Sequence, residues 1–228
     1  MTTFEVAELF KQYVDDSDQT FMSSDNAVTF LNIGYREFVS QVAEEDSNFY
    51  ATQELYTAVN DDELDLATTV TGNTIMGATP AGDRLYRIMR VSQAEASGNP
   101  RYYLQPSRSL VTVRNGINMY MLRGSKLLFS GQVENILVEY VGYNADPFTV
   151  ANIATSGAGV FIDDLVDFHD LIALLACKQY QIKDFAQNPV LMQQLAERKL
   201  ALTNYLSQGR TWANTGVVAA DELDYLQY

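Results

Sequence analysis

Apolar side chains recur at helical spacing in the first fifty residues. One such pattern runs from Phe4 to Val14 and stops at the acidic run 15–18. A second begins near Ser24 or Asp25, either of which can cap a helix, and runs to about Glu45. Its apolar positions fall three or four residues apart, at Ala27, Leu31, Tyr35, Phe38 and Val42. The sequence therefore predicts two N-terminal helices within residues 1–47.

From residue 48 to residue 147 the spacing of apolar residues changes towards two, which is typical of strands. Turn-forming sequences separate the runs at 98–100, 115–116, 124–125 and 130–131. Eight strands are predicted, at 49–56, 64–70, 85–93, 101–105, 110–114, 118–122, 126–129 and 136–143. The uncharged segment 72–82 is rich in Gly, Thr and Ala and is predicted to be a long loop or arm. Short strands at this spacing predict an antiparallel β sandwich or barrel.

The last third of the chain returns to helical spacing. A helix is predicted from Phe161, with acids in its first turns, where negative charge meets the positive end of the helix dipole. These acids are Asp163, Asp164, Asp167 and Asp170. Asn188-Pro189 ends this helix and begins another, which Gly209 is placed to cap. The pattern predicts an antiparallel helical hairpin within residues 148–210, after a linker, and an extended tail over residues 211–228.

These elements predict an α+β fold. Its helical bundle combines the N-terminal helices of residues 1–47 with the hairpin of residues 148–210, and the β region of residues 48–147 is an insertion between them. The hydrophobic content of 47% is enough for a substantial core. The start of the chain lacks a signal-peptide pattern, and its longest apolar run, 171–177, is too short to span a bilayer. We therefore expect a soluble protein that is made in a cytoplasm.

Charge is unevenly distributed along the chain, whose net charge is −14. Residues 1–65 hold 2 basic and 15 acidic side chains, residues 76–130 hold 8 and 2, and residues 131–228 hold 5 and 12. A basic middle between acidic ends favours an acidic partner, nucleic acid, or the acidic segments of a neighbouring copy. Charge balance within one subunit explains the pattern equally well.

The arginines of the basic middle are interleaved with tyrosines, a mixture that also serves to hold nucleic acid. Strand alternation puts Arg84 and Arg90 on one face and Arg87 on the other, so it predicts no continuous groove. We expect this surface to meet acidic surfaces of neighbouring subunits or of a partner protein. The candidate interface residues are Arg84, Arg87, Arg90, Arg101, Arg108 and Arg114.

No pattern of catalytic residues stands out. His169 is the only histidine and Cys177 the only cysteine, and eight residues of helix between them amount to roughly 12 Å of rise, too far for contact. We expect a structural histidine and a small buried hydrophobe, and no intrachain disulfide. No phosphate-binding loop is present, because Gly72, Gly77 and Gly82 lack the following Lys-Ser/Thr pair. The sequence predicts no catalytic or cofactor-binding residue.

Two acidic clusters raise the question of a metal site. Asp163, Asp167 and Asp170 share one face of the predicted helix and could bind a cation or act as paired carboxylates. Acids on a solvated first turn are the favoured interpretation. The run 61–65 lacks the glycine and the spaced ligands of a calcium loop. The sequence therefore predicts no metal ligand.

Three segments resemble the head-to-tail adaptor (connector) proteins of tailed bacteriophages. They are Asn26–Tyr35 (NAVTFLNIGY), Ile136–Tyr143 (ILVEYVGY) and Phe161–Ala176 (FIDDLVDFHDLIALLA), and the last is followed by a helix ending near Arg210. The resemblance implies a virion protein of the neck, synthesised in the host cytoplasm. It implies a ring, commonly dodecameric, that binds the portal protein and tail or nozzle proteins. Genomic DNA would pass through its channel without sequence-specific binding, and no membrane would be involved.

The predicted tail carries aromatic and aliphatic anchors but too few residues for a core of its own. They are Trp212, Leu223, Tyr225, Leu226 and Tyr228. The resemblance implies that this tail docks on the portal or on a neighbouring subunit. A function of another class remains open, because Tyr-rich strands with surface acids also suit a carbohydrate-binding β module of a virion or surface protein. An enzyme ranks third.

Overall fold

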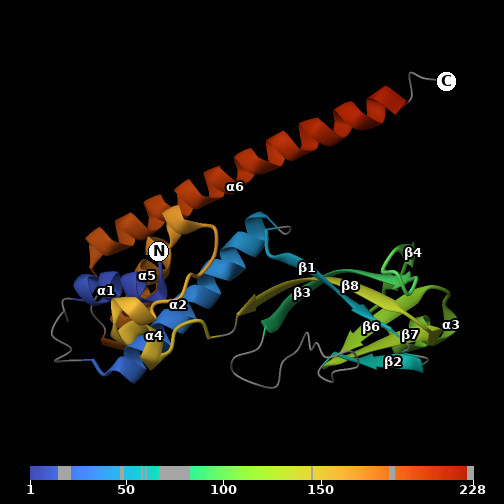
Figure 1. The fold of residues 1–228 in the computed structure, drawn as a ribbon, viewed down its shortest axis with the longest axis horizontal. Helices are drawn as coiled ribbons and strands as arrows, with labels where there is room; N and C mark the ends of the chain where they lie inside the picture. Colours follow the sequence, from blue (N-terminus) through green and yellow to red (C-terminus); the bar gives the residue numbers. More distant parts are fainter. Residues whose placement is uncertain are drawn as a thin grey trace. The chain divides into compact units, whose positions relative to one another are not determined.

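The computed structural model describes residues 1–14, 22–46, 49–57, 59, 61–66, 83–144, 146–184 and 188–224. The chain divides into two compact units. A helical unit comprises Met1–Phe49 and Asp146–Tyr228, and a β unit comprises Tyr50–Ala145 (Figure 1). The fold is therefore mixed α+β. The predicted β region, 48–147, and the β unit differ by two residues at each end.

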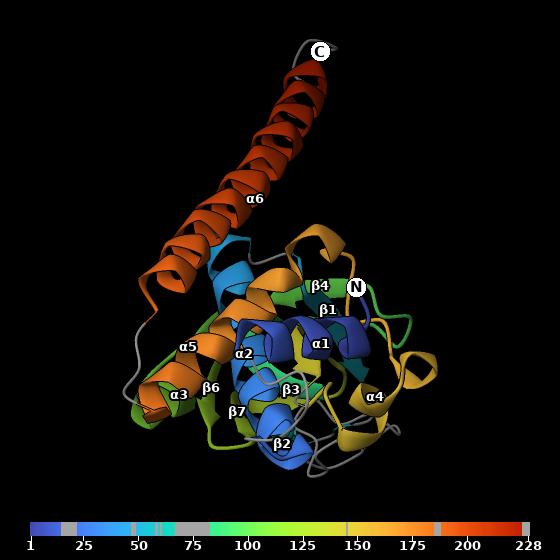
Figure 2. The same cartoon turned by 90° about the vertical axis from the view of Figure 1, so that its left-hand side faces the viewer.

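The helical unit is built from five α-helices among its described residues. They are α1 (Thr3–Tyr13), α2 (Ser24–Glu45), α4 (Val150–Ala154), α5 (Asp170–Asp184) and α6 (Pro189–Asp224). Short 3₁₀ turns occur at Ser156–Ala158 and Val166–Phe168. Figure 1 and Figure 2 both place α1 and α2 beside α5. Helix α5 thus lies at the centre of this unit's packing.

The two N-terminal helices are confirmed, and local capping explains where they start. The Thr2 hydroxyl accepts a hydrogen bond from the Glu5 amide (3.3 Å), and the Glu5 carboxylate accepts one from the Thr2 amide (2.7 Å). For α2 the cap is Ser23, whose hydroxyl accepts from the Asn26 amide at 3.3 Å. The cap is therefore one residue before the earlier of the two predicted candidates.

Helices α2 and α5 approach each other closely at Gly34. A Cβ atom at this position would lie 2.7 Å from the Ile172 carbonyl oxygen and 2.8 Å from the Ala176 amide nitrogen. Only glycine permits this contact without a shift of backbone. The α5 residues that face the other helices are wholly buried, as in the predicted apolar stripe: Leu171, Ile172, Ala173, Leu175 and Ala176.

The start of α5 differs from the sequence prediction, because the helix begins at Asp170 rather than near Phe161. Asp163 and Asp167 therefore precede the helix, as does Asp164, and they do not act as its first-turn acids. The Asp163 carboxylate instead accepts a hydrogen bond from the Leu165 amide (2.9 Å). Such short side-chain-to-backbone bonds compete with helix formation, which explains the delayed start.

The second predicted helix begins as expected but ends later. Asn188 caps α6, its side-chain oxygen accepting from the amides of Val190 (3.0 Å) and Leu191 (3.4 Å), and Pro189 occupies the first helical position. The helix passes through Gly209 and continues to Asp224, so the predicted cap at Gly209 and the extended tail over 211–224 are wrong. Glycine costs only about 1 kcal/mol relative to alanine inside a helix, which good helix formers nearby offset.

The β unit contains two four-stranded sheets, in the orders β1-β8-β3-β4 and β2-β7-β6-β5. The strands are β1 (Ala51–Tyr56), β2 (Asp61–Asp65), β3 (Asp83–Ala94), β4 (Pro100–Tyr103), β5 (Gln105–Pro106), β6 (Met119–Arg123), β7 (Lys126–Val133) and β8 (Ile136–Asn144). All neighbouring strands are antiparallel except β5 and β6, which pair in parallel.

Three predictions within this unit need correction. The segment 110–114 belongs to a helix, α3 (Leu110–Asn115), because the Ser109 hydroxyl caps it by accepting from the Thr112 amide at 3.4 Å. The predicted turn at 130–131 lies inside strand β7. The predicted strand 101–105 is divided between the two sheets as β4 and β5. Residues 67–70 of the predicted second strand and the predicted loop 72–82 lie outside the described residues.

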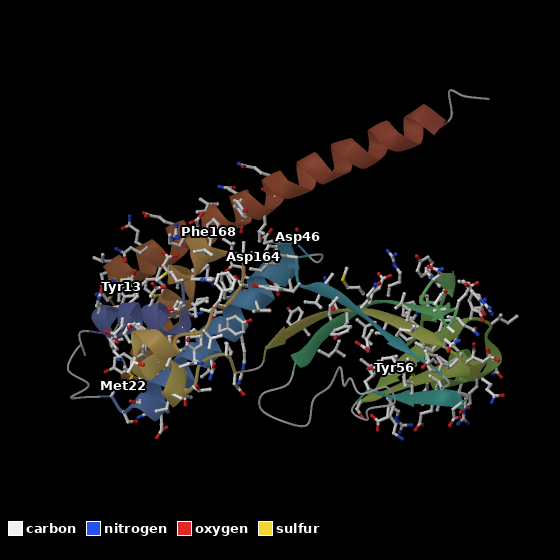
Figure 3. The ribbon with its side chains drawn as sticks, viewed as in Figure 1. Tyr13, Met22, Asp46, Tyr56, Asp164 and Phe168 are labelled. Carbon is white, nitrogen blue, oxygen red and sulfur yellow. The ribbon has the colours of Figure 1, made fainter. Side chains whose placement is uncertain are left out.

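Both sheets contribute to a single apolar core. Tyr56 is fully buried within it and is labelled in Figure 3. The other core residues are Leu64, Leu66, Val91, Leu104, Tyr120, Leu127, Phe129, Val133, Ile136, Val138 and Tyr140. In the described part of the chain, no helix has the length and apolar character needed to cross a membrane.

Candidate functional site

The predicted interface arginines lie on different elements of the β unit. Arg84, Arg87 and Arg90 belong to β3, Arg101 to β4 and Arg108 to the segment after β5. The side chain of Arg84 lies outside the described residues. The last of the group is Arg114, which is exposed on helix α3 rather than on a strand.

Strand β3 does not alternate regularly, and this changes which arginines share a face. Its pairing with β8 shifts between Leu85 and Arg87 and again between Ile88 and Arg90. Arg87 is opposite Val141 and Arg90 opposite Glu139, two residues apart on β8. Because opposed residues point to the same face, the extra residue places both arginines on one face of the sheet. The prediction that Arg87 points away from Arg90 is wrong.

Arg90 and Arg101 face carboxylates within the β unit. Arg90 lies 3.8 Å from the Glu139 carboxylate, and its guanidinium carbon is 4.8 Å from the ring centre of Tyr103. Arg101 lies 3.7 Å from the Glu95 carboxylate. Exposed pairs of this kind contribute at most about 1 kcal/mol to stability. They nevertheless reduce the positive charge that these two side chains offer to a partner.

Arg87 and Arg108 line a cleft of about 660 Å³ between strands β3 and β6. Tyr86 and Leu122, exposed by 37% and 42%, contribute apolar surface. The remaining lining residues are Ile88, Pro106, Ser107, Tyr120 and Met121. Among the described residues this lining holds two guanidinium groups and no carboxylate. We call it the arginine cleft.

The arginine cleft exists because the chain crosses between the two sheets beside it. The Leu104 amide donates to the Val91 carbonyl of one sheet (2.8 Å), and the next amide, that of Gln105, donates to a carbonyl of the other sheet (2.8 Å). Strand β4 pairs only with residues 92–94 of β3, and β5 only with residues 119–120 of β6. Within the described part of the chain, no strand pairs with the cleft side of β3 before residue 92 or of β6 after residue 120.

A second hollow on the β unit, of about 230 Å³, has a different chemistry. Its polar lining consists of side chains without charge, among them the amides of Gln93, Asn118 and Gln132 and the phenol of Tyr102. The Tyr102 hydroxyl donates to the Gln93 side-chain oxygen. Asn118 has a left-handed backbone (φ 55°), which positions the loop beside this hollow. We call it the amide pocket.

In the helical unit, charged side chains hold α6 against α2 and α5. Glu37 on α2 accepts from Lys178 on α5 (2.8 Å) and from Lys199 on α6 (3.1 Å). Partial burial of Glu37 opposes its ionisation, but the hydrogen bonds from both lysines outweigh this and lower its pKa. Glu37 is therefore a shared anion that connects three helices.

A second ionic contact lies at the start of α5. Arg198 on α6 donates to the Asp170 carboxylate (2.5 Å) and to the Asp167 carbonyl, and its guanidinium carbon is 5.3 Å from the ring centre of Phe168. The hydrogen bond that Arg198 donates to Asp170 raises the pKa of Arg198. Phe168 and Tyr13, labelled in Figure 3, both lie beside α6. Asp170 thus serves as an ion-pair partner between helices.

His169 and Cys177, the only histidine and the only cysteine of the chain, are both buried. His169 is fully buried, and its Nε2 atom lies 2.6 Å from the Asp163 carboxylate while Nδ1 lies 3.1 Å from the Met1 carbonyl oxygen. Cys177 is buried beside the Phe10 carbonyl, and burial raises the pKa of its thiol to about 12. A thiol with this pKa supplies almost no thiolate at neutral pH. Among the described residues no group of three or more acids, histidines or cysteines could hold a metal ion.

The predicted docking residues of the tail are only partly described. Trp212 and Leu223 belong to helix α6, and the structure does not describe their side chains. Tyr225, Leu226 and Tyr228 lie outside the described residues. The docking role of all five therefore stays a prediction.

Sequence reasoning missed the arginine cleft as a site, although it named two of its arginines. The relevant part of the sequence is the pair of very short strands on either side of Leu104. These strands belong to different sheets, which the alternation of apolar and polar residues does not reveal. Aliphatic exposure on α6 was also missed, since Val190 and Leu200 are each 62% exposed. No protein-family model matches this chain, and no curated protein matches it.

Proposed function

We propose that this chain is a virion structural protein that forms an adaptor ring between capsid and tail. In this proposal the ring docks on the portal protein, contacts tail or nozzle proteins on its other side, and lengthens the DNA channel. It acts without catalysis, and genomic DNA passes through its channel without sequence-specific binding. Its place is the neck of the virion.

The observation that carries the proposal is the unequal charge of the two units. The helical unit holds 7 basic and 20 acidic side chains, a net charge of −13, whereas the β unit holds 8 and 9, a net charge of −1. A ring requires a head-to-tail interface, in which two different surfaces of neighbouring copies complement each other. An acidic helical unit and an arginine-bearing β unit are two such surfaces.

The segments that resemble adaptor proteins support the proposal further, because two of them pack together. Gly34, in the first, lies against Ile172 of α5, in the third. His169, in the third segment, also packs on α2 just beyond the first segment, where its ring centre lies 6.4 Å from that of Phe38 at an interplanar angle of 79°. The resemblance therefore concerns parts of the chain that form one structural core.

The finer features of the fold belong to the same proposal. Asp170 at the start of α5 contacts Arg198 in α6, while only residues 185–188 separate the two helices. An antiparallel hairpin that completes a helical bundle with α1 and α2 accounts for both facts. A β sandwich likewise accounts for the two sheets that share one core.

Native mass spectrometry of the purified full chain, alone and mixed with a portal ring, tests the proposal. We expect a ring-sized assembly of the chain alone, or one copy bound for each portal subunit in the mixture. A chain that remains monomeric and does not bind the portal would overturn the adaptor function.

The amide pocket favours a second candidate, a carbohydrate-binding β module. Neutral amides beside a tyrosine provide hydrogen bonds and an apolar ring face, as a neutral sugar requires. A glycan array with the full chain would test this, with Tyr102→Ala as the variant. Binding of glycans by the wild-type chain that is lost in Tyr102→Ala would support the module. No binding to any glycan of the array would exclude it.

A further inference from the structure

We infer that the amide pocket binds the terminal N-acetylhexosamine of a glycan, with the acetyl methyl group against its apolar lining. An N-acetylhexosamine is a sugar whose ring carries an acetamido group in place of one hydroxyl. The inference rests on the second candidate function, the carbohydrate-binding module, and names the class of sugar for that same site. It does not depend on the adaptor ring.

The amide pocket lies where strand β7 leaves its two neighbours. In the described part of the chain, β7 pairs with β6 only as far as Phe129, and with β2 at residues 126–128 and again at Val133. Residues 130–132 thus form a bulge, a feature that redirects side chains and often lies beside functional sites. A Cβ atom at Gly131 in this bulge would meet no atom within 4 Å. The bulge and its glycine therefore leave room for a ligand.

The lining is neutral, which selects a ligand without charge. None of the described residues around the pocket is an acid, a lysine or an arginine. A charged ligand would lose its hydration there without meeting an opposite charge. The volume of about 230 Å³ is below the roughly 300–1,000 Å³ of pockets that enclose drug-sized ligands. The pocket therefore suits a single neutral sugar residue at the end of a glycan.

Part of the lining offers hydrogen bonds that suit an amide. The side-chain oxygen of Gln93 accepts from the Tyr102 hydroxyl, so its NH₂ group is the part of this amide that can donate to a ligand. The Ser130 oxygen accepts from the Met119 amide (3.1 Å), which leaves its hydroxyl proton as a donor. Asn118 is exposed at the pocket and carries both a donor and an acceptor. Together these groups can pair with the C=O and the N–H of an acetamido group.

Another part of the lining is apolar, and it distinguishes an acetamido group from a hydroxyl. Leu104, Phe129 and Val133 belong to it, and each is less than a tenth exposed. A sugar hydroxyl buried against them would lose its hydrogen bonds to water and gain none. A methyl group has no such bonds to lose, and its burial is favourable. The acetyl methyl of an N-acetylhexosamine therefore fits where the corresponding hydroxyl of a plain hexose does not.

Tyr102 favours a sugar over an acetylated lysine, which carries the same acetamido group. The Tyr102 ring is 39% exposed and lines the pocket, and its hydrogen bond to Gln93 helps to hold it in place. An aromatic ring offers a flat apolar face against which the C–H groups of a sugar ring can pack. The other hydroxyls of the sugar remain at the open end of the pocket, in contact with water. An acetylated lysine has only a flexible aliphatic stem at this position.

Saturation-transfer NMR with the full chain tests the inference. The probes are the methyl glycosides of N-acetylglucosamine and N-acetylgalactosamine, and their controls are the methyl glycosides of glucose and galactose, which have a hydroxyl in place of the acetamido group. We expect at least one N-acetyl probe to bind at least about tenfold more tightly than its matched control. Its acetyl methyl protons should receive the strongest saturation, because they lie against buried apolar side chains.

Two variants locate the binding in the pocket. Gly131→Leu adds a side chain where the pocket is open and should abolish binding, whereas its control Gly157→Leu changes a glycine of the helical unit that also has no atom within 4 Å of its Cβ position. Asn118→Asp keeps the shape of the side chain but removes its donor, and it should weaken binding at least about fivefold. Its control is Asn115→Asp, an exposed position outside the lining, which should leave affinity within about twofold.

Four results would overturn the inference. Equal affinity for the N-acetyl sugars and their controls would overturn it and leave the carbohydrate-binding module standing, whereas failure of every sugar to bind would overturn both. Binding of N-acetyl-lysine amide as tightly as the N-acetyl sugars would overturn the choice of a sugar. Binding that is unchanged in both Gly131→Leu and Asn118→Asp would mean that the site lies elsewhere. Native mass spectrometry of these variants should show the same assembly as wild type, so the adaptor function is tested separately.

Discussion

The helical unit and the β unit were predictable from sequence to different degrees. Helices α1 and α2 start at side-chain caps within a few residues of their first turn, so the local sequence identifies them. In the β unit, β4 and β5 lie next to each other in sequence and belong to different sheets. Local patterns therefore locate the two N-terminal helices, whereas the β unit depends on which distant strand each segment meets.

The units also differ in how they use charged side chains. In the helical unit, Glu37 and Asp170 pair with lysine and arginine between helices, and so these charges contribute to the packing of the unit. In the β unit, Arg87 and Arg108 line a surface cleft. Charged side chains thus connect helices in one unit, whereas two arginines line a surface cleft on the other.

The largest expected effect comes from truncating one core residue in each unit. Leu171 of the helical unit and Leu127 of the β unit are both fully buried. Replacing either with alanine should lower the free energy of unfolding by about 3 kcal/mol through lost burial and a residual cavity. Hydrogen exchange should locate each loss of protection in the unit that carries the change.

The matched control for these two variants is Leu200→Ala, on an exposed position of α6, which should change the free energy of unfolding by less than about 0.5 kcal/mol. Equal loss of protection in both units from a single core change would contradict the description of two separate cores.

A smaller effect is expected from Gly34→Ala, which tests the close contact of α2 and α5. The new methyl group would lie 2.7 Å from a backbone oxygen of α5, so the helices must separate. Urea unfolding should show a loss of about 2 kcal/mol. Gly131→Ala in β7 is the control, because a Cβ there meets no atom within 4 Å. A variant at Gly34 as stable as wild type would show that the helices are not in backbone contact.

The smallest effect is expected from Glu37→Gln, and it depends on pH. Since the pKa of Glu37 is lowered from its ordinary value of 4.5 in the folded protein, its contribution is fully present above pH 4.5 and is lost as pH falls through the lowered value. The free energy of unfolding, measured with urea, should be about 1 kcal/mol higher for wild type than for the variant at neutral pH. This difference should shrink below pH 4.5.

Glu44→Gln, on an exposed position of the same helix, controls for the general loss of a negative charge. A difference between wild type and Glu37→Gln that persists unchanged at low pH would mean that the ion pairs with Lys178 and Lys199 do not stabilise the fold.

The errors of prediction have identifiable physical causes. Segment 110–114 has the β-branched and aliphatic composition of a strand, yet the cap at Ser109 makes it helical. Asp163 delays the start of α5 because its carboxylate bonds to the Leu165 amide and faces His169. Each case is a side-chain hydrogen bond that outweighs intrinsic preference.

The candidate site was predicted in part. The arginines of the β unit were identified from charge and composition, because both can be counted directly in the sequence. The bulges of β3 that put Arg87 and Arg90 on one face, and the crossing at Leu104 that leaves the arginine cleft open, were not identified. Both depend on pairing with residues far away in sequence.

The amino-acid sequence alone was enough to predict the mixed α+β class, the N-terminal helices, most strand positions, the uneven charge and the burial of Cys177. These follow from periodicity, capping and burial, which act within a few turns of the chain or on a single side chain. Only the tertiary structure decided which strands share a sheet, where α5 begins, and which arginines line one cleft. Those outcomes depend on contacts between residues that are far apart in sequence. A local pattern does not show which of these residues meet.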